Sequence, residues 1–571
     1  MLKKLFYFFA KETNFILLCI FIITFLGLFS LFYDQWVIRP ENTVYTFAHN
    51  YMFDYYQYLS WMKDGADGKI LITSRFSPDN FIRKPVYLFY PIMGFIFSKL
   101  GLSLFLGYTL ARIFLSLVKF LAIYYLISQI FNDSFKRKLA FVFCLFLPPF
   151  YGISPLRMLF SYIASVDILQ RAFFLPHDMA TTVFIILGTI SFSQWLNKGE
   201  IKGQVKGIFK GQLRVLRGLP SAPSITLRMN PLRARKSATT KPLITNYQLL
   251  ITSFLFFFLA SIINPAILTI FYLFLGLATL LTFVQKPSLR GLVGPGIIFL
   301  AGLPFIVYYQ YLFKTTLPFS WMYYQQKNVF LNINFKDYLL SLGPVSILFI
   351  FGLPAFLKKK DFLFNFLICW AIIPFFLMPL LGKIIPLSQE RLFEISHFIP
   401  LSILATEGLI KIKNAVMVRL LIGILLFFSL PYLYISVKFQ VDLFTKPYFN
   451  IYIPKSVIET FNWLDKNTPD ESIVVANYFT SNMLPAFSHN KVLFGHDFVT
   501  YKAAQRLEEV KAVFNPKTPA NQIREILKRN KIDYLLLSPE GGGLEWTNLK
   551  NVSGLKLLFN NPENSIYEVS R

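Results

Sequence analysis

The sequence has little charge and very little cysteine for its length. Of its 571 residues only 15% are charged and three are cysteine, whereas 55% are hydrophobic. Cys19, Cys144 and Cys369 each lie within an apolar run, which excludes a disulfide framework. Acidic residues number 30 against 57 basic ones, for a formal charge of +27. Although a basic chain can bind nucleic acid, this low charged fraction and a mean hydropathy of +0.51 indicate a membrane protein.

Several signatures of catalysis and cofactor binding are also missing. The sequence has no Walker-type phosphate loop, no His-Glu-x-x-His, no cysteine-pair metal site and no Gly-x-Ser-x-Gly. We therefore expect no resident cofactor. A divalent metal is left open, but no residue pattern supports one.

Apolar runs long enough to cross a bilayer recur along the chain. A transmembrane helix needs about 17–25 mostly apolar residues. Eleven segments are expected to span: 14–33, 107–130, 139–156, 176–195, 247–263, 265–284, 293–312, 341–357, 362–381, 392–410 and 415–437. The first is too long for a secretion signal and has no small-residue cleavage pattern after it. The sequence therefore predicts an α-helical polytopic membrane protein.

The distribution of Lys and Arg indicates the topology, because cytoplasmic loops retain positive charge. One further apolar segment, 85–102, is ambiguous. If it does not span, the cytoplasmic segments hold 25 basic and 4 acidic residues. If it spanned, the basic cluster 136–138 and the loop 196–246 would face outward. We therefore expect a cytoplasmic N-terminus, with 85–102 an interfacial or re-entrant helix interrupted by Pro85 and Pro91.

Composition divides the chain near residue 440. Residues 1–440 are expected to form the transmembrane module, with a long outer loop at 34–106 and a disordered basic cytoplasmic loop at 196–246. After this, strand-like apolar runs alternate with helical stretches, which predicts a small extracytoplasmic α/β domain at 441–571. Its 15 basic and 14 acidic residues, counted from Gln440, give no electrostatic footprint for nucleic acid.

The first outer loop holds the main candidate for chemistry. Spacings of three and four residues place a stripe on one face of an amphipathic helix lying on the membrane: Tyr51, Asp54, Tyr55, Tyr58 and Met62. A carboxylate set in an aromatic stripe is desolvated, which suits Asp54 to general-base work. The alternative, that Asp54 caps the helix or faces solvent, stays open.

Two basic residues share a face of the second span, Arg112 near its outer end and Lys119 seven residues later. A charge at mid-bilayer costs about 2.5–3.5 kcal/mol on insertion scales, so Lys119 should face the bundle or a cavity. Both side chains are candidate ligands for a lipid phosphate. A partner within the bundle, or a side chain that snorkels to the interface, is the alternative.

Further polar candidates lie where spans meet the outer face. Arg171, His177 and Asp178 enter the fourth expected span and could bind phosphate or sugar hydroxyls. Glu390 and Arg391 precede the tenth, where an ordinary surface ion-pair cluster is the alternative. All five histidines fall on the outer side, and His496 is a candidate lid residue in a loop of the α/β domain.

Three stretches resemble the GT-C class of membrane glycosyltransferases. They are DYYQYLSWMKDGADG (54–68), KPVYLFYPIMG (84–94), and the region from NWLDKNTPDESIVVA through SHNKVLFGHDFVTY. The resemblance implies a sugar donor on polyprenyl or dolichyl phosphate and a first-loop acid that activates an acceptor hydroxyl of a glycan, lipid or protein. Asp54 would then be the base, and transfer would invert the anomeric carbon. Many members have two adjacent acids here, whereas Asp54 lies between Phe53 and Tyr55.

The hypothesis that follows is a glycosyltransferase at the outer face of the plasma membrane, whose donor phosphate is held by Arg or Lys. Two alternatives remain. A transporter or flippase of lipid-linked sugars would fit the many spans, although the sequence shows no internal repeat. A membrane-anchored glycan-binding protein would place the function in the C-terminal domain, although eleven spans exceed what anchoring needs.

Overall fold

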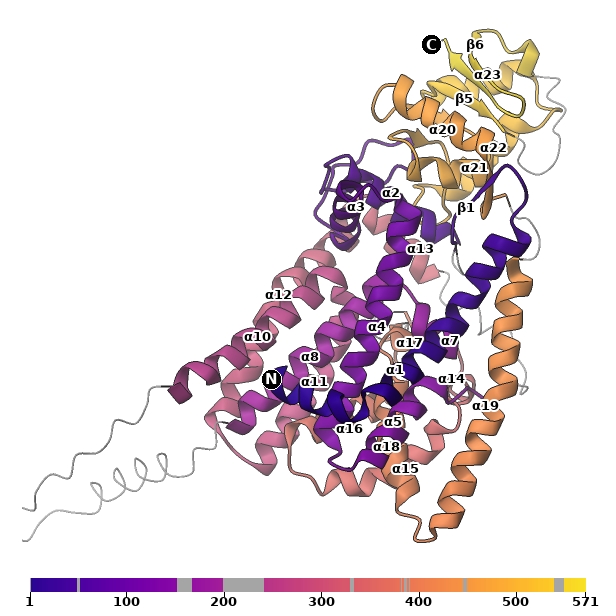
Figure 1. The fold of residues 1–571 in the computed structure, drawn as a ribbon. Coiled ribbons are helices and arrows are strands. Elements are labelled where there is room, and N and C mark those ends of the chain that lie inside the picture. Colours follow the sequence, from indigo (N-terminus) through magenta and orange to yellow (C-terminus); the bar gives the residue numbers. More distant parts are fainter. Residues whose placement is uncertain are drawn as a thin grey trace, which may run out of the picture.

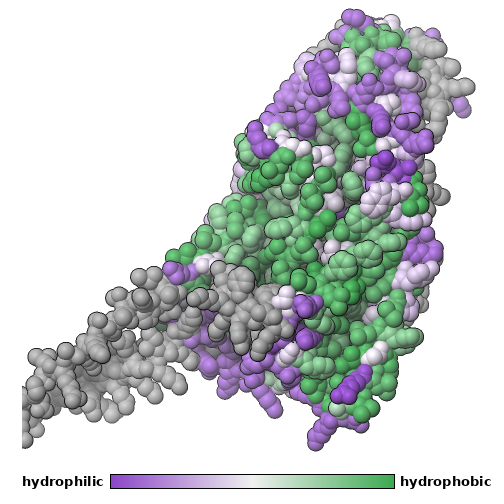
Figure 2. Space-filling model, in the orientation of Figure 1, coloured by the Kyte–Doolittle hydropathy of each residue, from purple (hydrophilic) through white to green (hydrophobic). Residues whose placement is uncertain are grey.

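A bundle of long helices carries a small mixed-sheet domain at one end, here called the domain end (Figure 1). The computed structural model describes residues 2–48, 52–150, 167–198, 241–328, 333–381, 383–384, 388–389, 391–444, 449–538 and 549–570. Hydrophobic side chains cover the visible flank of the bundle, and hydrophilic ones gather on the small domain (Figure 2). The bundle is thus an apolar belt with a polar cap.

Six helices among the described residues are long and apolar enough to cross a membrane. They are α1 (Leu2–Tyr33), α4 (Leu104–Ile130), α8 (Pro176–Lys198), α11 (Pro265–Gln285), α12 (Leu289–Thr315) and α19 (Ala415–Phe444). A further crossing forms if α14 (Phe335–Leu342) and α15 (Val345–Leu357), bent by 80°, make one span. Shorter apolar helices are α10 (Lys241–Ile263), α16 (Phe362–Leu377) and α18 (Phe398–Ile410). The multi-pass helical prediction is confirmed, while the count of eleven stays a prediction.

Some expected spans are shorter or broken. The described part of the segment expected at 139–156 belongs to α5 (Ser134–Phe146), which ends before Pro148 and Pro149, where helical backbone is disfavoured. Residues 151–156 lie outside the described residues. The segment expected at 392–410 divides into α17 (Arg391–Glu394) and α18, with Ser396 at φ 53° between them. Most of the loop 196–246 lies outside the described residues, which resume with α10.

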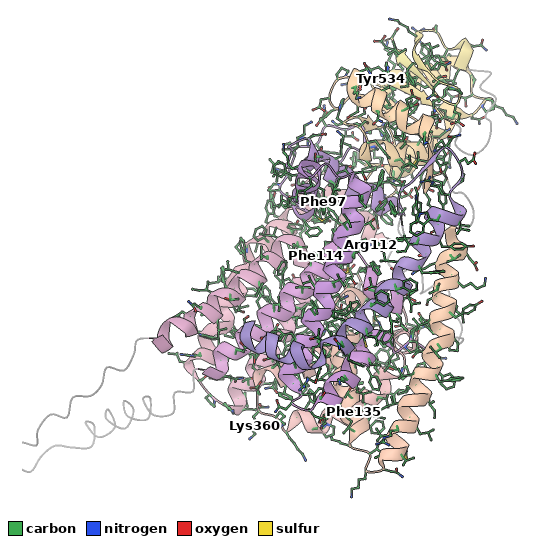
Figure 3. All side chains as sticks on the ribbon, in the orientation of Figure 1. Phe97, Arg112, Phe114, Phe135, Lys360 and Tyr534 are labelled. Carbon is green, nitrogen blue, oxygen red and sulfur yellow. The ribbon has the colours of Figure 1, made fainter. Side chains whose placement is uncertain are left out.

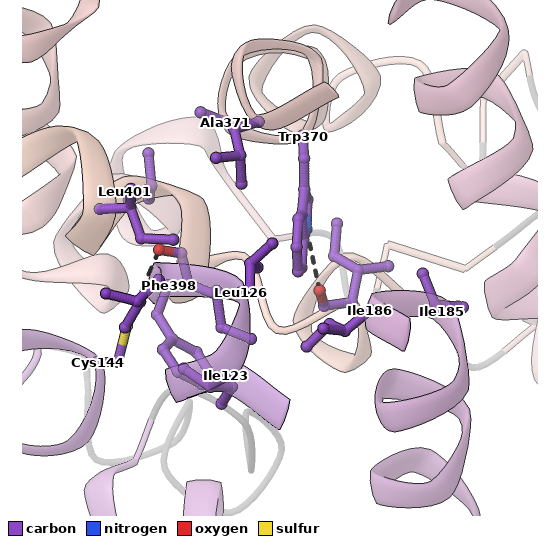
Figure 4. Packing of buried hydrophobic residues seen from close by; sticks show 14 of the residues in the cluster. Ile123, Leu126, Cys144, Ile185, Ile186, Trp370, Ala371, Phe398 and Leu401 are labelled. Atoms are coloured by element: carbon purple, nitrogen blue, oxygen red, sulfur yellow. Dashed lines mark hydrogen bonds between the residues drawn. The ribbon is translucent and has the colours of Figure 1, made fainter. Parts of the chain in front are cut away.

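The core of the bundle is built where short helices cross long ones. Trp370 of α16 is fully buried and donates its indole N–H to the carbonyl oxygen of Ile395 over 3.1 Å. Phe398 of α18 and Leu126 of α4 lie in the same close-up view (Figure 4). This packing fixes the chain around α17, which carries a candidate site residue.

The first outer loop forms a layer between the bundle and the small domain (Figure 1). It contains a π-helical turn (Asp34–Ile38), β1 (Thr43–Tyr45), α2 (Met52–Ala66) and α3 (Phe89–Lys99). Its two α-helices cross closely because of two glycines: a Cβ on Gly65 would lie 1.8 Å from the carbonyl oxygen of Pro91, and one on Gly94 would lie 1.9 Å from that of Met62. Tyr55 and Met62 of the expected stripe are fully buried against protein, so this face of α2 does not lie on the membrane. Tyr51 lies outside the described residues.

The expectation that Pro91 interrupts 85–102 is wrong. Pro91 is the third residue of α3, where the N–H that proline lacks has no intrahelical partner in any helix. Pro85 does not interrupt the helix either, because it precedes α3. Two further short helices precede the C-terminal domain in the chain, α7 (Ile168–Phe173) and α13 (Phe319–Asn328).

The C-terminal domain has a five-stranded sheet in the order β4-β3-β5-β7-β6. Its strands are β3 (Ile473–Val475), β4 (Lys491–Val492), β5 (Tyr534–Leu537), β6 (Leu555–Asn560) and β7 (Ser565–Val569). β3 pairs in parallel with β4 and β5, and β7 pairs antiparallel with β5 and β6. The helices are α20 (Lys455–Asn467), α21 (Tyr478–Met483), α22 (Ala503–Phe514) and α23 (Ala520–Arg529), with single 3-10 turns at Leu484–Ala486 and Leu549–Asn551. The expected α/β character is confirmed.

The first outer loop and the C-terminal domain are joined by backbone pairing and by ion pairs. β1 pairs antiparallel with β2 (Tyr452–Pro454). Glu471 accepts from Arg83 of the loop at 2.7 Å and lies 3.1 Å from Lys491 of β4. Lys69 of the loop lies 2.5 Å from Asp470. The two segments, separate in the sequence-based prediction, form one docked unit.

Candidate active site

Asp54 lies in the first turn of α2, at the junction of the bundle and the C-terminal domain. A carboxylate there interacts favourably with the positive end of the helix dipole. Its side chain is 39% exposed, so the expected desolvation by the aromatic stripe is wrong. The reason is that the side chains of the stripe point in different directions. Tyr55 and Met62 are fully buried, whereas Asp54 is turned toward the C-terminal domain.

His496 of the C-terminal domain contacts this carboxylate. Its Nε2 lies 3.1 Å from Oδ1 of Asp54, and its side chain is only 2% exposed. The backbone N–H of Phe498 donates to Nδ1 of the same ring over 3.1 Å. Nδ1 is therefore an acceptor, and the proton on Nε2 points at Asp54. The loop that the sequence offered as a lid places a hydrogen-bond donor on the candidate base.

Aromatic rings line the side of α2 next to Asp54. Tyr58 stacks on Tyr90 of α3 with ring centroids 4.4 Å apart, and Trp61 stacks on Tyr87 at 4.5 Å. The Tyr90 hydroxyl lies 2.6 Å from Nδ1 of His177. Burial raises the pKa of Tyr90 well above its usual value, so the phenol stays protonated. Its O–H therefore donates the hydrogen bond, and Nδ1 of His177 accepts it.

His177 and Asp178 start α8 and are buried behind these rings. His177 Nε2 lies 3.4 Å from Oδ1 of Asp178, and Asn264 donates its side-chain N–H to the same oxygen over 3.0 Å. The other oxygen of Asp178, Oδ2, makes no hydrogen bond within the part of the chain that the structure describes. The chain Tyr90, His177, Asp178 and Asn264 thus runs from α3 to the start of α11, and its one carboxylate, Asp178, keeps unused acceptor capacity.

Arg391 supplies the nearby positive charge. Its Nη1 lies 2.8 Å from both carboxylate oxygens of Glu394, and the two side chains are 27% and 15% exposed. Arg391 interacts electrostatically with Asp178 and His177, and Asp54 also interacts electrostatically with His177. The residues that the sequence offered separately, Asp54, His177, Asp178 and Arg391, therefore share one electrostatic environment. Glu390 lies outside the described residues, as does His49.

The other three candidate cations lie in the interior of the bundle. Arg112 donates to the carbonyl oxygens of Phe173 and Phe174 at the end of α7. Lys119 donates to the Arg171 carbonyl over 3.3 Å, and Arg171 donates to that of Cys144 over 3.2 Å. Figure 3 labels Arg112 on α4, below the first-loop layer. These donors satisfy backbone groups that helix ends leave without partners, although Nη1 of Arg112 has no hydrogen bond to any described residue.

Three contributors were missed by sequence reasoning. Tyr90 looked like part of an apolar segment, and Tyr87 looked the same; only the tight crossing of α2 and α3 brings them to Asp54 and His177. Asn264 precedes Pro265, which is the usual pattern of a helix N-cap, and it does cap α11 through Ile267. Its second contact, to Asp178, has no signal in the sequence.

Comparison with known proteins bears on the fold. No protein-family model matches the sequence, and no match was found among curated proteins. The arabinofuranosyltransferase AftD from Mycobacteria matches over 98% of this chain and 42% of its own, with a TM-score of 0.53 and 11% identity. The fold is of the GT-C type. The chain spans under half of AftD, so this likeness concerns architecture alone.

Two further solved structures have lower scores. ArnT from Cupriavidus metallidurans, bound to undecaprenyl phosphate, matches with a TM-score of 0.49 and 12% identity, covering 97% of this chain and 98% of its own. The Archaeoglobus fulgidus oligosaccharyltransferase matches with a TM-score of 0.48 and 12% identity, covering 97% and 74%. The GT-C-type fold expected from the sequence resemblance is confirmed by the likeness to AftD.

Proposed function

We propose that this GT-C-type protein is an integral membrane glycosyltransferase that moves a sugar from a polyprenyl-phosphate-linked donor to an acceptor hydroxyl. One observation carries the proposal: Asp54 is an accessible carboxylate at the domain end of an apolar bundle, and His496 donates a hydrogen bond to it. Both Asp54 and Arg391 interact electrostatically with His177. AftD and ArnT, which have similar folds, are named for sugar transfer and undecaprenyl phosphate binding respectively. The acceptor is a glycan, lipid or protein at the outer face of the plasma membrane.

Asp54 acts as the general base in this proposal. The acceptor O–H gives its proton to the carboxylate as the acceptor oxygen bonds to the anomeric carbon of the donor. The bond from that carbon to the phosphate oxygen breaks, and its electron pair leaves with the polyprenyl phosphate. Attack opposite the leaving group inverts the anomeric centre, and Asp54 then releases its proton to water. No metal or other cofactor is invoked, which remains a prediction.

Arg391 is the proposed ligand of the leaving phosphate. A guanidinium binds phosphate oxygens through paired N–H groups, and stabilising the charge that develops on them is a large catalytic effect. Its side chain is 27% exposed, in contrast to Arg112, Lys119 and Arg171, which are nearly fully buried. The sequence also offered His177 and Asp178 as ligands of sugar hydroxyls, but both are buried behind the rings of Tyr58 and Tyr90, so we do not assign them to the substrate. The apolar flank of the bundle would accommodate the polyprenyl chain (Figure 2).

The test uses the purified full-length protein in proteoliposomes with a panel of undecaprenyl-phosphate-linked hexoses and pentoses as donors and a panel of glycan, lipid and peptide acceptors. Release of undecaprenyl phosphate is measured, because every sugar and acceptor yields this product. Asp54→Asn should lower the rate about 100- to 10,000-fold, the usual contribution of a general base. Asp67→Asn, at the other end of α2, should leave it unchanged.

Two results would overturn the proposal. Full activity of Asp54→Asn would show that Asp54 is not the general base. Movement of labelled undecaprenyl-phosphate sugar across the vesicle membrane, with no release of undecaprenyl phosphate by the unaltered protein, would instead identify a flippase.

A further inference from the structure

The contact between Asp54 and His496 joins positions 442 residues apart, on two different parts of the fold. Asp54 belongs to the first outer loop, whereas His496 follows β4 in the C-terminal domain. A contact at 3.1 Å between such positions requires both segments to be held in a defined relation. The question is whether the histidine covers the site or orients the base.

The His496 ring is fixed from several sides. Its backbone N–H donates to Oγ1 of Thr500 over 3.1 Å, and the Thr500 hydroxyl donates to the carbonyl oxygen of Phe76 over 2.7 Å. Phe498 holds Nδ1 as described above, and the ring of Phe76 meets the imidazole edge to face at 6.0 Å. Since Phe76 belongs to the first outer loop, the histidine is anchored to the same segment as Asp54. Such anchoring is unlike that of a mobile lid.

The surrounding turn is pressed against the first loop. A Cβ added to Gly495 would lie 2.8 Å from the carbonyl oxygen of Ser481 and 2.9 Å from the ring of Phe76. Asn482 donates to the Gly495 carbonyl over 2.7 Å. The turn therefore has little space to move while the domain stays docked.

We propose that His496 is a positioning residue, through which the docked C-terminal domain orients the Asp54 carboxylate. The inference rests on the proposed function. The imidazole holds Oδ1 through its Nε2–H, and Oδ2 of Asp54, which makes no hydrogen bond within the described ranges, is left to receive the acceptor proton. Orientation of a reacting group within a fraction of an ångström is worth large factors in rate. The C-terminal domain thus completes the reaction site.

Three variants of the full-length protein separate orientation from packing, in the undecaprenyl phosphate release assay. His496→Phe keeps a buried ring but cannot donate to Asp54. His496→Gln places an amide N–H near the position of Nε2. His489→Phe is the matched control, because His489 lies in the same domain, contacts Asp465 at 3.1 Å and does not touch Asp54.

His496→Phe should lower kcat about 100-fold with KM changed less than about threefold, because the acceptor still binds but the base is misaligned. His496→Gln should recover at least about a tenth of the unaltered kcat, since its N–H restores the hydrogen bond. His489→Phe should keep full kcat even if its melting temperature falls.

Equal activity of His496→Phe and the unaltered protein, with Asp54→Asn inactive, would overturn the positioning role and leave the proposed function standing. Equal loss in His496→Phe and His496→Gln, matched by a similar loss in His489→Phe, would also overturn it, because packing would then explain the effect. Full activity of Asp54→Asn would instead remove Asp54 as the base, and no release of undecaprenyl phosphate by the unaltered protein would overturn the proposed function itself.

Discussion

Charged and polar side chains occupy two regions of this molecule in different ways. In the interior of the bundle, Arg112, Lys119 and Arg171 are at most 3% exposed and donate to main-chain carbonyls around α7. In contrast, Asp54 at the domain end is 39% exposed and Arg391 of α17 is 27% exposed, and their partners are side chains. Charged residues that look alike in the sequence therefore differ in whether they can contact a substrate.

This difference bears on which cations can serve chemistry. A donor used by a buried carbonyl is unavailable to a substrate unless the carbonyl loses its partner, which costs about 1–3 kcal/mol. Asp54 and Arg391 are paired with side chains instead, so contact with a substrate leaves no buried carbonyl without a partner. We therefore assign Arg112, Lys119 and Arg171 a role in the structure of the bundle, and Asp54 and Arg391 a role in the reaction. Three substitutions test this account.

The largest effect is expected in the interior. Arg171→Ala removes a donor from the Cys144 carbonyl and a guanidinium that lies 4.4 Å from the centroid of the Phe398 ring. It should destabilise the protein by about 3 kcal/mol, because it leaves both a cavity and an unpaired carbonyl. Thermal unfolding of the detergent-purified protein measures this. An unchanged unfolding midpoint combined with lost undecaprenyl phosphate binding would reverse the assignment.

The two ends of the chain also show what can and cannot be predicted from the sequence. Apolar run lengths predicted the helices, and the strand-like apolar runs expected after residue 440 include β3 and β5. Spacing also predicted a helix around Asp54. Neither run length nor spacing could show that Gly65 and Gly94 let α2 and α3 cross closely, so the stripe was assigned to the membrane surface. That Asp54 meets His496 depends on tertiary docking, for which a single sequence holds no signal.

A smaller effect is expected from the helix crossing that supports Asp54. Gly65→Ala would place a Cβ 1.8 Å from the Pro91 carbonyl oxygen, so α2 and α3 must separate. We expect a loss of about 2 kcal/mol in stability, as for other overpacked sites, together with reduced transfer activity because α2 carries Asp54. Gly276→Ala, in α11, is the matched control, since its Cβ would meet no atom within 4 Å. Equal stability and activity of the two variants would contradict the close crossing.

The smallest effect concerns the ion pairs that dock the domain. Burial alone would raise the pKa of Glu471, but hydrogen bonds from Arg83 and Lys491 outweigh it and hold that pKa below its usual value. The stabilisation is therefore present above the unfolded pKa, about 4.3, and is lost as the pH falls through the lower folded pKa. Because Glu471 is 35% exposed, we expect only about 0.2–1 kcal/mol.

Thermal unfolding between pH 7 and pH 3 measures this contribution. Glu471→Gln should unfold at a slightly lower temperature at pH 7 and lose less stability on acidification than the unaltered protein. Identical acid profiles for the two proteins would show that these ion pairs do not hold the domain in place.

The central claim is that the reaction occurs between the two partly exposed groups, Asp54 and Arg391. A cryo-EM structure of the full-length protein with undecaprenyl phosphate tests it most directly. The account predicts the phosphate within ion-pair distance of Arg391, on the same side of the bundle as Asp54 and His496. A phosphate bound instead by Lys119 or Arg171, away from Asp54, would contradict it.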